Sequence, residues 1–433
     1  MSRSPILGVA AAGLALIGCA DDADLGRAAG ALHTLSLGPE QGTDAPSFGR
    51  AEQPQHSVSL APSASGLLMV WDDGRRNEGG DVYATRATAL GAPLDPAGVA
   101  VTEAPGTQEQ PRVASDGKGW LVVWTDYRST YHSVFGRRVD AAGQPLDDAG
   151  GFPISTGQGA REMADVAFDG NNYVVVWQDR RGPAADIYAA RVTPDGKVLD
   201  ADGVLLSTDV GEKAYPRVSP GPGHSLVTWQ QALGEEMAPA LIACRIDASA
   251  QPLDGGGIAL DPAVTPGVPA AAAFGSGIHA VVYQAAEPGG GDVMARRLDA
   301  DGLLLDATPL SISQDQGEQG GPAVAFDGTS FLVAWHHRTA ATDFDVRARR
   351  LTPAGSLLGT ADVVITDAPQ QQARPAIALS EGGAVVAWDD LPPWQNMDIF
   401  AARWDANDAV SAPVLVELGG QRAARPGAGG EQR

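Results

Sequence analysis

A tryptophan that ends a short apolar run recurs along this chain at a nearly constant interval. The aromatic residue appears seven times, at steps of 53, 53, 52, 54, 52 and 53 residues: Trp71, Trp124, Trp177, Trp229, Tyr283, Trp335 and Trp388. An arginine follows each of them by 14 to 16 residues: Arg86, Arg138, Arg191, Arg245, Arg297, Arg350 and Arg403. Self-similarity at a fixed period of this length is typical of a repeat architecture.

Each repeat is predicted to contain only β-strands. The apolar runs at 121–124, 174–177 and 332–335 are typical of strands that are covered on both faces. An Asp-Gly pair before the run predicts a tight hairpin, and an alternating strand and a further turn follow it. Seven units of about 53 residues, with four strands in each, predict an all-β fold, a seven-bladed β-propeller of four-stranded antiparallel blades.

The charge of the chain limits its partners. Its 30 basic and 53 acidic residues give a formal net charge of −23 and a pI near 4.5. This balance argues against nucleic acids and anionic membrane surfaces as partners. It is also the balance of an ordinary, highly soluble protein, so it does not itself identify a ligand.

The N-terminal segment, 1–18, is predicted to be a signal peptide rather than part of the fold. Its apolar stretch is too short to cross a bilayer. The residues Leu16-Ile17-Gly18-Cys19 resemble the lipobox of bacterial lipoproteins. In that family the peptide is cut before the cysteine, which is then lipidated, so the resemblance implies a lipid on Cys19. With Ala20 next to it, the outer membrane or cell surface of a Gram-negative bacterium is expected, and an ordinary signal peptide is the alternative.

The remaining boundaries follow from composition and repeat phase. Residues 19–50 are predicted to be a tether, 51–418 the propeller, and 419–433 a disordered tail. A short strand at 35–37 is a candidate for pairing with the last repeat and closing the ring, because closure removes exposed edges. The chain's own terminal strand at 414–416 is the competing candidate.

Variable loops on one face are where binding is expected. That face carries the connections between repeats and the loops between the second and third strands. Candidate ligand-binding residues in these loops are Asp73, Arg75, Asp126, Tyr127, Arg128, Tyr131, Asp179, Arg181 and Trp394. The Asp and Arg residues would form a polar patch over three adjacent blades, or else pair locally across a hairpin. The aromatic residues could stack on sugar rings.

Known catalytic and metal-binding motifs are mostly absent from the sequence. It contains no HExxH, P-loop or paired CxxC motif. The segments 200–203 and 299–302 hint at calcium but lack the other oxygen ligands of an EF-hand loop. No cofactor is therefore predicted. The recurrent arginines are expected to pair with carboxylates, and Cys244 is expected to be a small buried side chain.

The repeat unit, Asp-Gly-x-x-aromatic-Leu-Val-Val-Trp with later Arg-Val-Asp and Pro-Leu-Asp segments, resembles the tandem repeats of secreted propeller-like bacterial lipoproteins. A looser resemblance is to the Asp-box of sialidases, although Ser115-Asp116-Gly117 and Trp120 are spaced differently. The resemblance identifies the repeat and not an activity. From the variable face and the absent enzyme motifs we expect a lipid-anchored, non-catalytic protein that binds a protein or glycan and touches the membrane only through its anchor. The alternative is a carbohydrate-active hydrolase or lyase that uses carboxylates on the same face.

Overall fold

The computed structural model describes residues 55–75, 80–234, 237–286, 291–313, 317–338, 343–369, 371–391 and 397–416. The predicted signal peptide, Cys19, the tether with its 35–37 strand, Trp394 and the 419–433 tail lie outside these ranges. Every regular element within them is a β-strand. No helix in this part of the chain is long and apolar enough to cross a membrane.

The described strands, β1 to β28, form seven consecutive sets of four, and within each set neighbouring strands are antiparallel. The first strands are β1 (Gln55–Ser63), β5 (Gln108–Ser115), β9 (Arg161–Phe168), β13 (Glu212–Gly221), β17 (Ala271–Gly275), β21 (Gln319–Phe326) and β25 (Gln371–Ser380). The second strands are β2 (Gly66–Asp73), β6 (Trp120–Asp126), β10 (Tyr173–Asp179), β14 (His224–Ala232), β18 (Ile278–Gln284), β22 (Phe331–Arg338) and β26 (Gly383–Leu391).

The third strands are β3 (Asp81–Ala87), β7 (Ser133–Val139), β11 (Asp186–Val192), β15 (Ala240–Asp247), β19 (Val293–Asp299), β23 (Phe344–Leu351) and β27 (Asp398–Asp405). The fourth strands are β4 (Val99–Ala100), β8 (Phe152–Ser155), β12 (Val204–Leu205), β16 (Ile258–Asp261), β20 (Leu310–Ser313), β24 (Leu357–Thr366) and β28 (Val414–Leu415). A single parallel bridge, Phe344 to Gln371, links the sixth and seventh sets. We call the sets blades 1 to 7.

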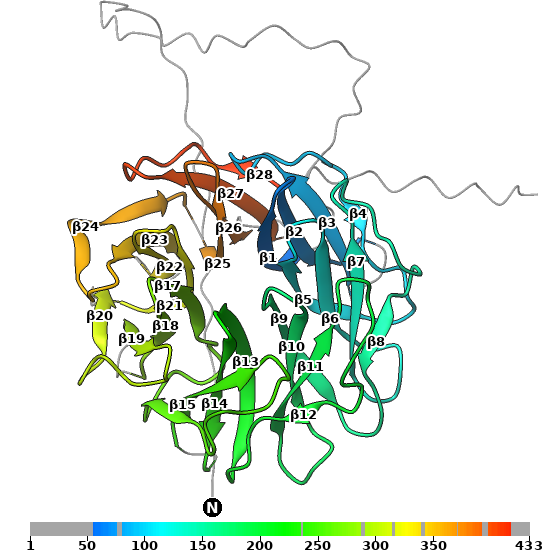
Figure 1. The fold of residues 1–433 in the computed structure, drawn as a ribbon. Helices are drawn as coiled ribbons and strands as arrows, with labels where there is room; N and C mark the ends of the chain where they lie inside the picture. The colour runs from blue at the N-terminus through cyan, green and yellow to red at the C-terminus, as the bar shows by residue number, and fades with distance from the viewer. Residues whose placement is uncertain are drawn as a thin grey trace, which may run out of the picture. The chain divides into compact units, whose positions relative to one another are not determined.

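The first strands of all seven blades surround one central cavity, as in a propeller (Figure 1). Apolar clusters fill the spaces between adjacent blades. One of them joins Met69 and Trp71 of blade 1 to Val385 and Ile399 of blade 7, so the ring closes between the first and last blades. The outer strand of blade 7 is the chain's own β28, which pairs with β27. The predicted all-β propeller is confirmed.

The recurrent aromatic residues lie at the centre of the blades. All seven are at most 2% exposed, as expected because each second strand is covered by a neighbouring blade on both faces. Trp124 illustrates their surroundings, because its ring stacks on Phe135 of the third strand at a centroid distance of 6.5 Å. Gly151, with a φ of +67°, approaches the indole closely, and a Cβ there would lie 2.5 Å from Trp124 Cη2. The tight fit explains why a glycine is needed at this position.

Six of the seven recurrent arginines pair with carboxylates, as predicted, whereas Arg403 donates to the backbone carbonyls of Glu381 and Gly382. In blades 1 to 5 the guanidinium binds the Asp of the following turn, in the pairs Arg86–Asp95, Arg138–Asp147, Arg191–Asp200, Arg245–Asp254 and Arg297–Asp306. Several also reach the next blade, since Arg245 Nη1 donates to the carbonyl of Ala300 at 2.9 Å. Cys244 is fully buried, and burial raises the pKa of its thiol. These features hold the blades together.

Candidate functional site

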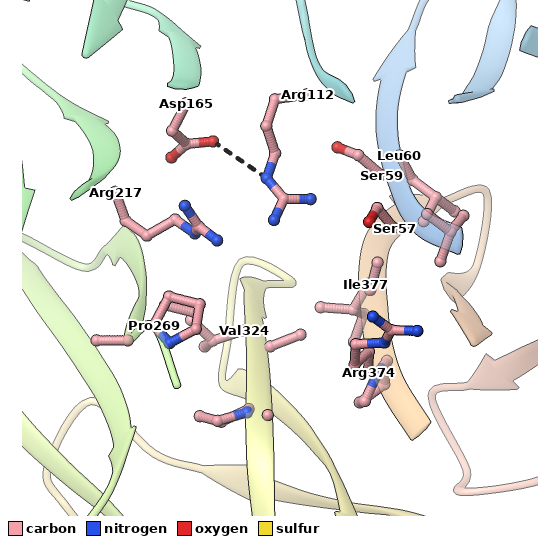
Figure 2. Close-up of a pocket in the computed structure, with 18 of the residues that line it drawn as sticks. Ser57, Ser59, Leu60, Arg112, Asp165, Arg217, Pro269, Val324, Arg374 and Ile377 are labelled. Carbon is pink, nitrogen blue, oxygen red and sulfur yellow. Dashed lines mark ion pairs between the residues drawn. The ribbon is translucent and has the colours of Figure 1, made fainter. Parts of the chain in front are cut away.

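The candidate site is a cavity at the centre of the seven blades. Its volume is about 470 Å³, within the range of small-molecule sites. Its wall consists of the first strands of the blades, the segment before β17 and His336 of β22. Figure 2 shows the side chains of Arg112, Asp165 and Arg217 on one side of the cavity, with Val324, Arg374 and Ile377 on other parts of its wall.

A β-bulge near the start of the first strand turns the side chains that follow it toward this cavity. In six blades a residue near the start of the strand has a left-handed backbone: Ser57, Gln110, Met163, Tyr215, Gly321 and Arg374, with φ of 51° to 60°. Five of these are not glycine, and such residues cost about 1–3 kcal/mol each, so the surrounding structure must hold them. The preceding blade does so in places. Thr125 Oγ1, for example, accepts the N–H of Met163 at 3.2 Å. A recurrent bulge re-aims the side chains that follow it.

The residue two positions after the bulge faces the cavity and differs between blades. These equivalent positions hold Ser59, Arg112, Asp165, Arg217, Ala271, Ala323 and Ala376, in blade order, and all of them line the cavity. Blades 1 to 4 therefore contribute a polar wall with three charged side chains. Blades 5 to 7 contribute only methyl groups at the same height. The cavity is chemically one-sided although the scaffold repeats.

Two arginines and one aspartate make up the charged part of the wall. Arg112 Nε lies 3.9 Å from Asp165 Oδ1, too far for a hydrogen bond, and Asp165 Oδ2 accepts the N–H of Val218 at 2.8 Å. Arg217 donates to the carbonyl of Pro216 at 2.8 Å and has no ion pair with any residue in the described ranges. Arg217 is partly buried in the channel, and desolvation lowers its pKa to about 10, with repulsion from Arg112 adding to the effect and attraction to Asp165 opposing it. The wall therefore carries one uncompensated positive charge.

A second charged group lies where blades 1 and 7 meet. Arg374 Nε is 2.7 Å from Asp389 Oδ2, and burial raises the pKa of Asp389 to about 6 in spite of this arginine. Burial also raises the pKa of Asp72 to about 7, which the Asp389 carboxylate increases and a hydrogen bond from Ser57 opposes. Ser57 and Arg374 line the cavity, so these two carboxyl groups lie directly behind its wall.

A histidine completes the polar lining on the side of blade 6. His336 lies beside Gly320 and Gly321 and packs edge-on against Phe344 at a centroid distance of 5.2 Å. Its Nδ1 is buried and has no hydrogen-bond partner within the described part of the chain. Burial lowers the pKa of His336 to about 4, and Arg374 contributes, so the ring is neutral at pH 7. A neutral imidazole can donate a hydrogen bond to a ligand or accept one.

The predicted Asp and Arg residues of the rim form three equivalent clasps. Each Asp is fully buried and accepts the indole N–H of the tryptophan two residues earlier, at distances of 3.1, 2.9 and 3.0 Å for Asp73, Asp126 and Asp179. The Arg two residues later pairs with the same carboxylate, in Arg75–Asp73, Arg128–Asp126 and Arg181–Asp179. Each guanidinium also lies over a third-strand ring, 4.0 to 4.1 Å from its centroid.

These clasps are what the local-pairing alternative predicts, and they leave the carboxylate oxygens inaccessible to a ligand. First strands strengthen two of them, because Gln55 Nε2 donates to Asp73 at 3.0 Å and Arg161 Nε lies 3.2 Å from Asp179. The geometry favours a structural role for these six residues. Their role in a ligand patch stays a prediction.

The aromatic candidates differ in exposure. Tyr127 packs against His132 at a centroid distance of 4.0 Å, and burial together with Glu109 raises the pKa of Tyr127 to about 12. Tyr131, on the same loop, is 45% exposed and could contact a ligand on the loop face. Trp394 lies outside the described residues. Tyr131 is therefore more exposed than Tyr127.

Metal binding finds no support in the acidic turns that suggested calcium. Asp299 Oδ1 accepts the N–H groups of Asp301 and Leu303, and Asp200 pairs with Arg191, so both carboxylates already serve the turns. Within the described ranges, no group of three or more His, Cys, Asp or Glu side chains is arranged to hold a metal ion.

Sequence reasoning missed the charged cavity wall, although a signal for it exists. Each cavity-facing position lies 12 residues before the recurrent aromatic residue. When the repeats are aligned on that residue, this column changes from Ser, Arg, Asp and Arg to three alanines. The change of residue type at this position is not apparent in a single repeat, and it becomes visible only when the seven repeats are aligned on the aromatic residue.

The fold and its cavity define a seven-bladed β-propeller with a polar central channel. No family model and no curated protein matches the chain. The BP39L lectin from Burkholderia pseudomallei is similar in structure, with a TM-score of 0.57 at 13% identity over 84% of this chain and 99% of the lectin. A puromycin-hydrolyzing peptidase from Mycobacterium tuberculosis has a TM-score of 0.53 at 15% identity over 84% of this chain. This chain spans about half of the peptidase, 54%. Similarities at this identity show the shared fold alone.

Proposed function

We propose that this protein is a non-catalytic binding protein that holds a glycan or protein ligand in the central cavity and on the loop face around it. The observation that carries the proposal is the one-sided wall: Arg112, Asp165 and Arg217 oppose alanines at equivalent positions. Three blades fold with alanine there, so the architecture does not need a larger side chain at this height. The charged residues of the other blades are therefore available for a ligand.

Energetics support the same proposal. Moving a charged group away from water is costly unless a partner compensates for it. Arg217 lies in the channel without an ion pair among the described residues. Perturbed ionisable groups in a concave site are typical of functional sites. A ligand that pairs with this wall would offset the free energy lost by moving the charge away from water.

Binding without catalysis is also within what this scaffold supports. The BP39L lectin uses a similar propeller, so sugar binding is compatible with the fold, although a fold alone does not decide function. Ser57 and Ser59 provide hydroxyl groups in the cavity, and Ala323 and Ala376 provide a small apolar surface. Such a mixture of polar and apolar groups is common in ligand sites.

A cavity-filling variant tests the proposal. Ala323→Trp would place an indole in the cavity, whereas Ala142→Trp makes the same change on an exposed turn. On a broad glycan array, and with captured protein partners identified by mass spectrometry, we expect wild type and Ala142→Trp to bind the same ligand and Ala323→Trp to lose it. Retained binding by a folded Ala323→Trp protein would contradict the cavity as the site.

A hydrolase is the second candidate, and the carboxyl groups behind the wall favour it. Asp72 and Asp389 have pKa values raised to about 7 and about 6, in the range where a carboxyl group can act as a general acid. This candidate requires release of new reducing ends from a polysaccharide, with activity lost in Asp72→Asn. Binding without any product supports the non-catalytic proposal.

We also propose that the propeller is held at the outer membrane or cell surface by a lipid on Cys19. The lipobox-like Leu16-Ile17-Gly18-Cys19 sequence supports this anchor. Metabolic labelling with a radioactive fatty acid, comparing wild type with Cys19→Ser, tests it. The wild-type chain should carry the label and sediment with membranes, and the variant should do neither. An unlabelled wild-type chain would contradict the anchor.

A further inference from the structure

The cavity wall lacks one negative charge. Arg112 and Arg217 face one another across the cavity side of blades 2 to 4, with Asp165 beside them (Figure 2). Asp165 is held by the backbone of Val218, and its 3.9 Å distance from Arg112 leaves the guanidinium N–H groups largely unused. Two guanidinium groups with free donors form a geometry that suits a carboxylate, which can accept several N–H bonds at once.

Other positive charge near the cavity is already neutralised. Arg374 binds Asp389 at 2.7 Å. The deficit is therefore located at the Arg112–Arg217 pair and not spread around the ring. A net charge of −23 for the whole chain makes an attractive site for an anion unusual on this protein, so the pair stands out against its surroundings.

The rest of the wall suits a hydroxylated ligand with an apolar face. Ser57, Ser59 and His336 supply hydrogen-bonding groups, and no described residue is a hydrogen-bond partner of the buried His336 Nδ1. Ala323 and Ile377 provide a surface of small and branched apolar groups. A sugar ring presents hydroxyl groups at its edge and C–H groups on its faces, so it matches both parts of the wall.

We propose that the cavity binds an acidic sugar, whose carboxylate is clamped between Arg112 and Arg217 and whose ring lies against the alanine wall of blades 5 to 7. This inference rests on the proposed binding function and narrows its ligand from any glycan or protein to a uronic-acid-type saccharide. Asp165 lies beside the clamp, 3.9 Å from Arg112 Nε, and is held in place by the N–H of Val218.

Calorimetric titration of the full-length protein tests this inference. The probes are a panel of uronic-acid oligosaccharides, each beside its own methyl ester, which keeps the sugar and removes the charge. We expect a free acid to bind and its ester to bind about 10- to 100-fold more weakly, the factor that a lost charged hydrogen bond gives. Arg217→Gln should weaken binding of the acid by a similar factor and leave binding of the ester unchanged.

Two controls keep the result interpretable. Arg180→Gln removes an arginine on the exposed rim, where Arg180 pairs with Glu212, and should bind the acid as wild type does. Arg217→Gln also removes a partly buried charge with no ion pair among the described residues, so its Tm without ligand should equal or exceed that of wild type. A marked fall in this Tm would make Arg217 structural and overturn the inference.

The remaining outcomes separate this inference from the proposed function. If acids and esters bind equally and Ala323→Trp abolishes both, the cavity is a binding site but the carboxylate clamp is wrong. If no uronic-acid saccharide binds, the inference is overturned, and the array then shows whether a neutral glycan or a protein occupies the cavity. If Ala323→Trp leaves all binding intact, the cavity proposal fails as well.

Discussion

Removing the Asp126 carboxylate tests whether the rim clasps stabilise the fold or bind a ligand. Asp126 is fully buried and accepts four hydrogen bonds: from the Trp124 indole at 2.9 Å, from the Arg128 backbone N–H at 2.9 Å, and from Arg128 Nε and Nη2 at 2.7 and 2.5 Å. In Asp126→Ala the indole N–H loses its partner inside the blade. Arg128 keeps its bond to the Gly150 carbonyl and its position over Phe135.

The magnitude follows from burial. Breaking a buried ion pair by removing one partner costs about 3–5 kcal/mol, and an unsatisfied buried donor accounts for about 1–3 kcal/mol of such losses. The Arg128 side chain is 23% exposed and can recover some hydration, so we expect the lower end, about 3 kcal/mol. The entropy of unfolding of a folded unit of about 360 residues is roughly 0.75 kcal/mol/K at its Tm. Dividing the loss of about 3 kcal/mol by this entropy predicts that the Tm falls by about 4 °C.

Thermal unfolding of the full-length protein, followed by circular dichroism and calorimetry, measures this change. Asp148→Ala, an exposed aspartate in the same blade, is the matched control and should stay within about 1 °C of wild type. If Asp126→Ala unfolds at the wild-type temperature but loses ligand binding, the carboxylate contacts ligand and our structural interpretation of the clasp is wrong. A destabilised variant, in turn, could not be used as evidence for a rim binding site.

Three further predictions concern packing and pH. Gly151→Ala should destabilise the fold by more than about 2 kcal/mol, because the new Cβ would lie 2.5 Å from the Trp124 ring. In the control Gly170→Ala, the new Cβ has no atom within 4 Å, so only backbone strain should destabilise it. Equal unfolding temperatures for the two variants would refute the close contact. The pKa of Asp72 is raised to about 7 in the native state, so on raising the pH the unfolded chain loses this proton first, and the free energy of unfolding falls between about pH 4 and 7. Asp72→Asn lacks this loss, so the difference in Tm, variant minus wild type, should increase from pH 4 to pH 8. A constant difference would count against the raised pKa. Burial lowers the pKa of His279 to about 3, so on acidification the unfolded chain takes up a proton first, and the free energy of unfolding falls as the pH drops below about 6.5. In urea titrations, the free energy of unfolding of His279→Phe should depend less steeply on pH in this range. The same pH dependence as wild type would contradict this.

The repeat period was sufficient to predict the fold. A tryptophan every 53 residues requires seven equivalent buried sites, and the alternating strand with its arginine defines the third strand of each blade. The Arg138–Asp147 pair follows from the same period, because both residues recur in phase. These features are visible in sequence since each depends on local spacing within one repeat.

The cavity was harder to predict because it depends on seven strands that are distant in the chain. A bulge at a left-handed residue such as Gln110 or Tyr215 decides which side chains face the channel, and ordinary residue types give little sign of it. A register one residue different would have turned Arg112 and Arg217 away from the cavity. The rim motif was easy to see in sequence, but its burial beneath the indole was not.

Repetition itself helps to separate structure from function in this protein. A feature that recurs at an equivalent position and is fully satisfied within its blade, such as the clasp of Asp126, is explained by what the fold requires. A charged residue at a position where other blades have alanine is not explained in this way, because those blades are stable without it. Arg217 is the strongest such case, since it has a lowered pKa in the channel and no ion pair within the described ranges. Its retention at a cost in stability is reasonable if an anionic ligand repays that cost, and the ligand-free Tm of Arg217→Gln is therefore as informative about function as the binding measurement.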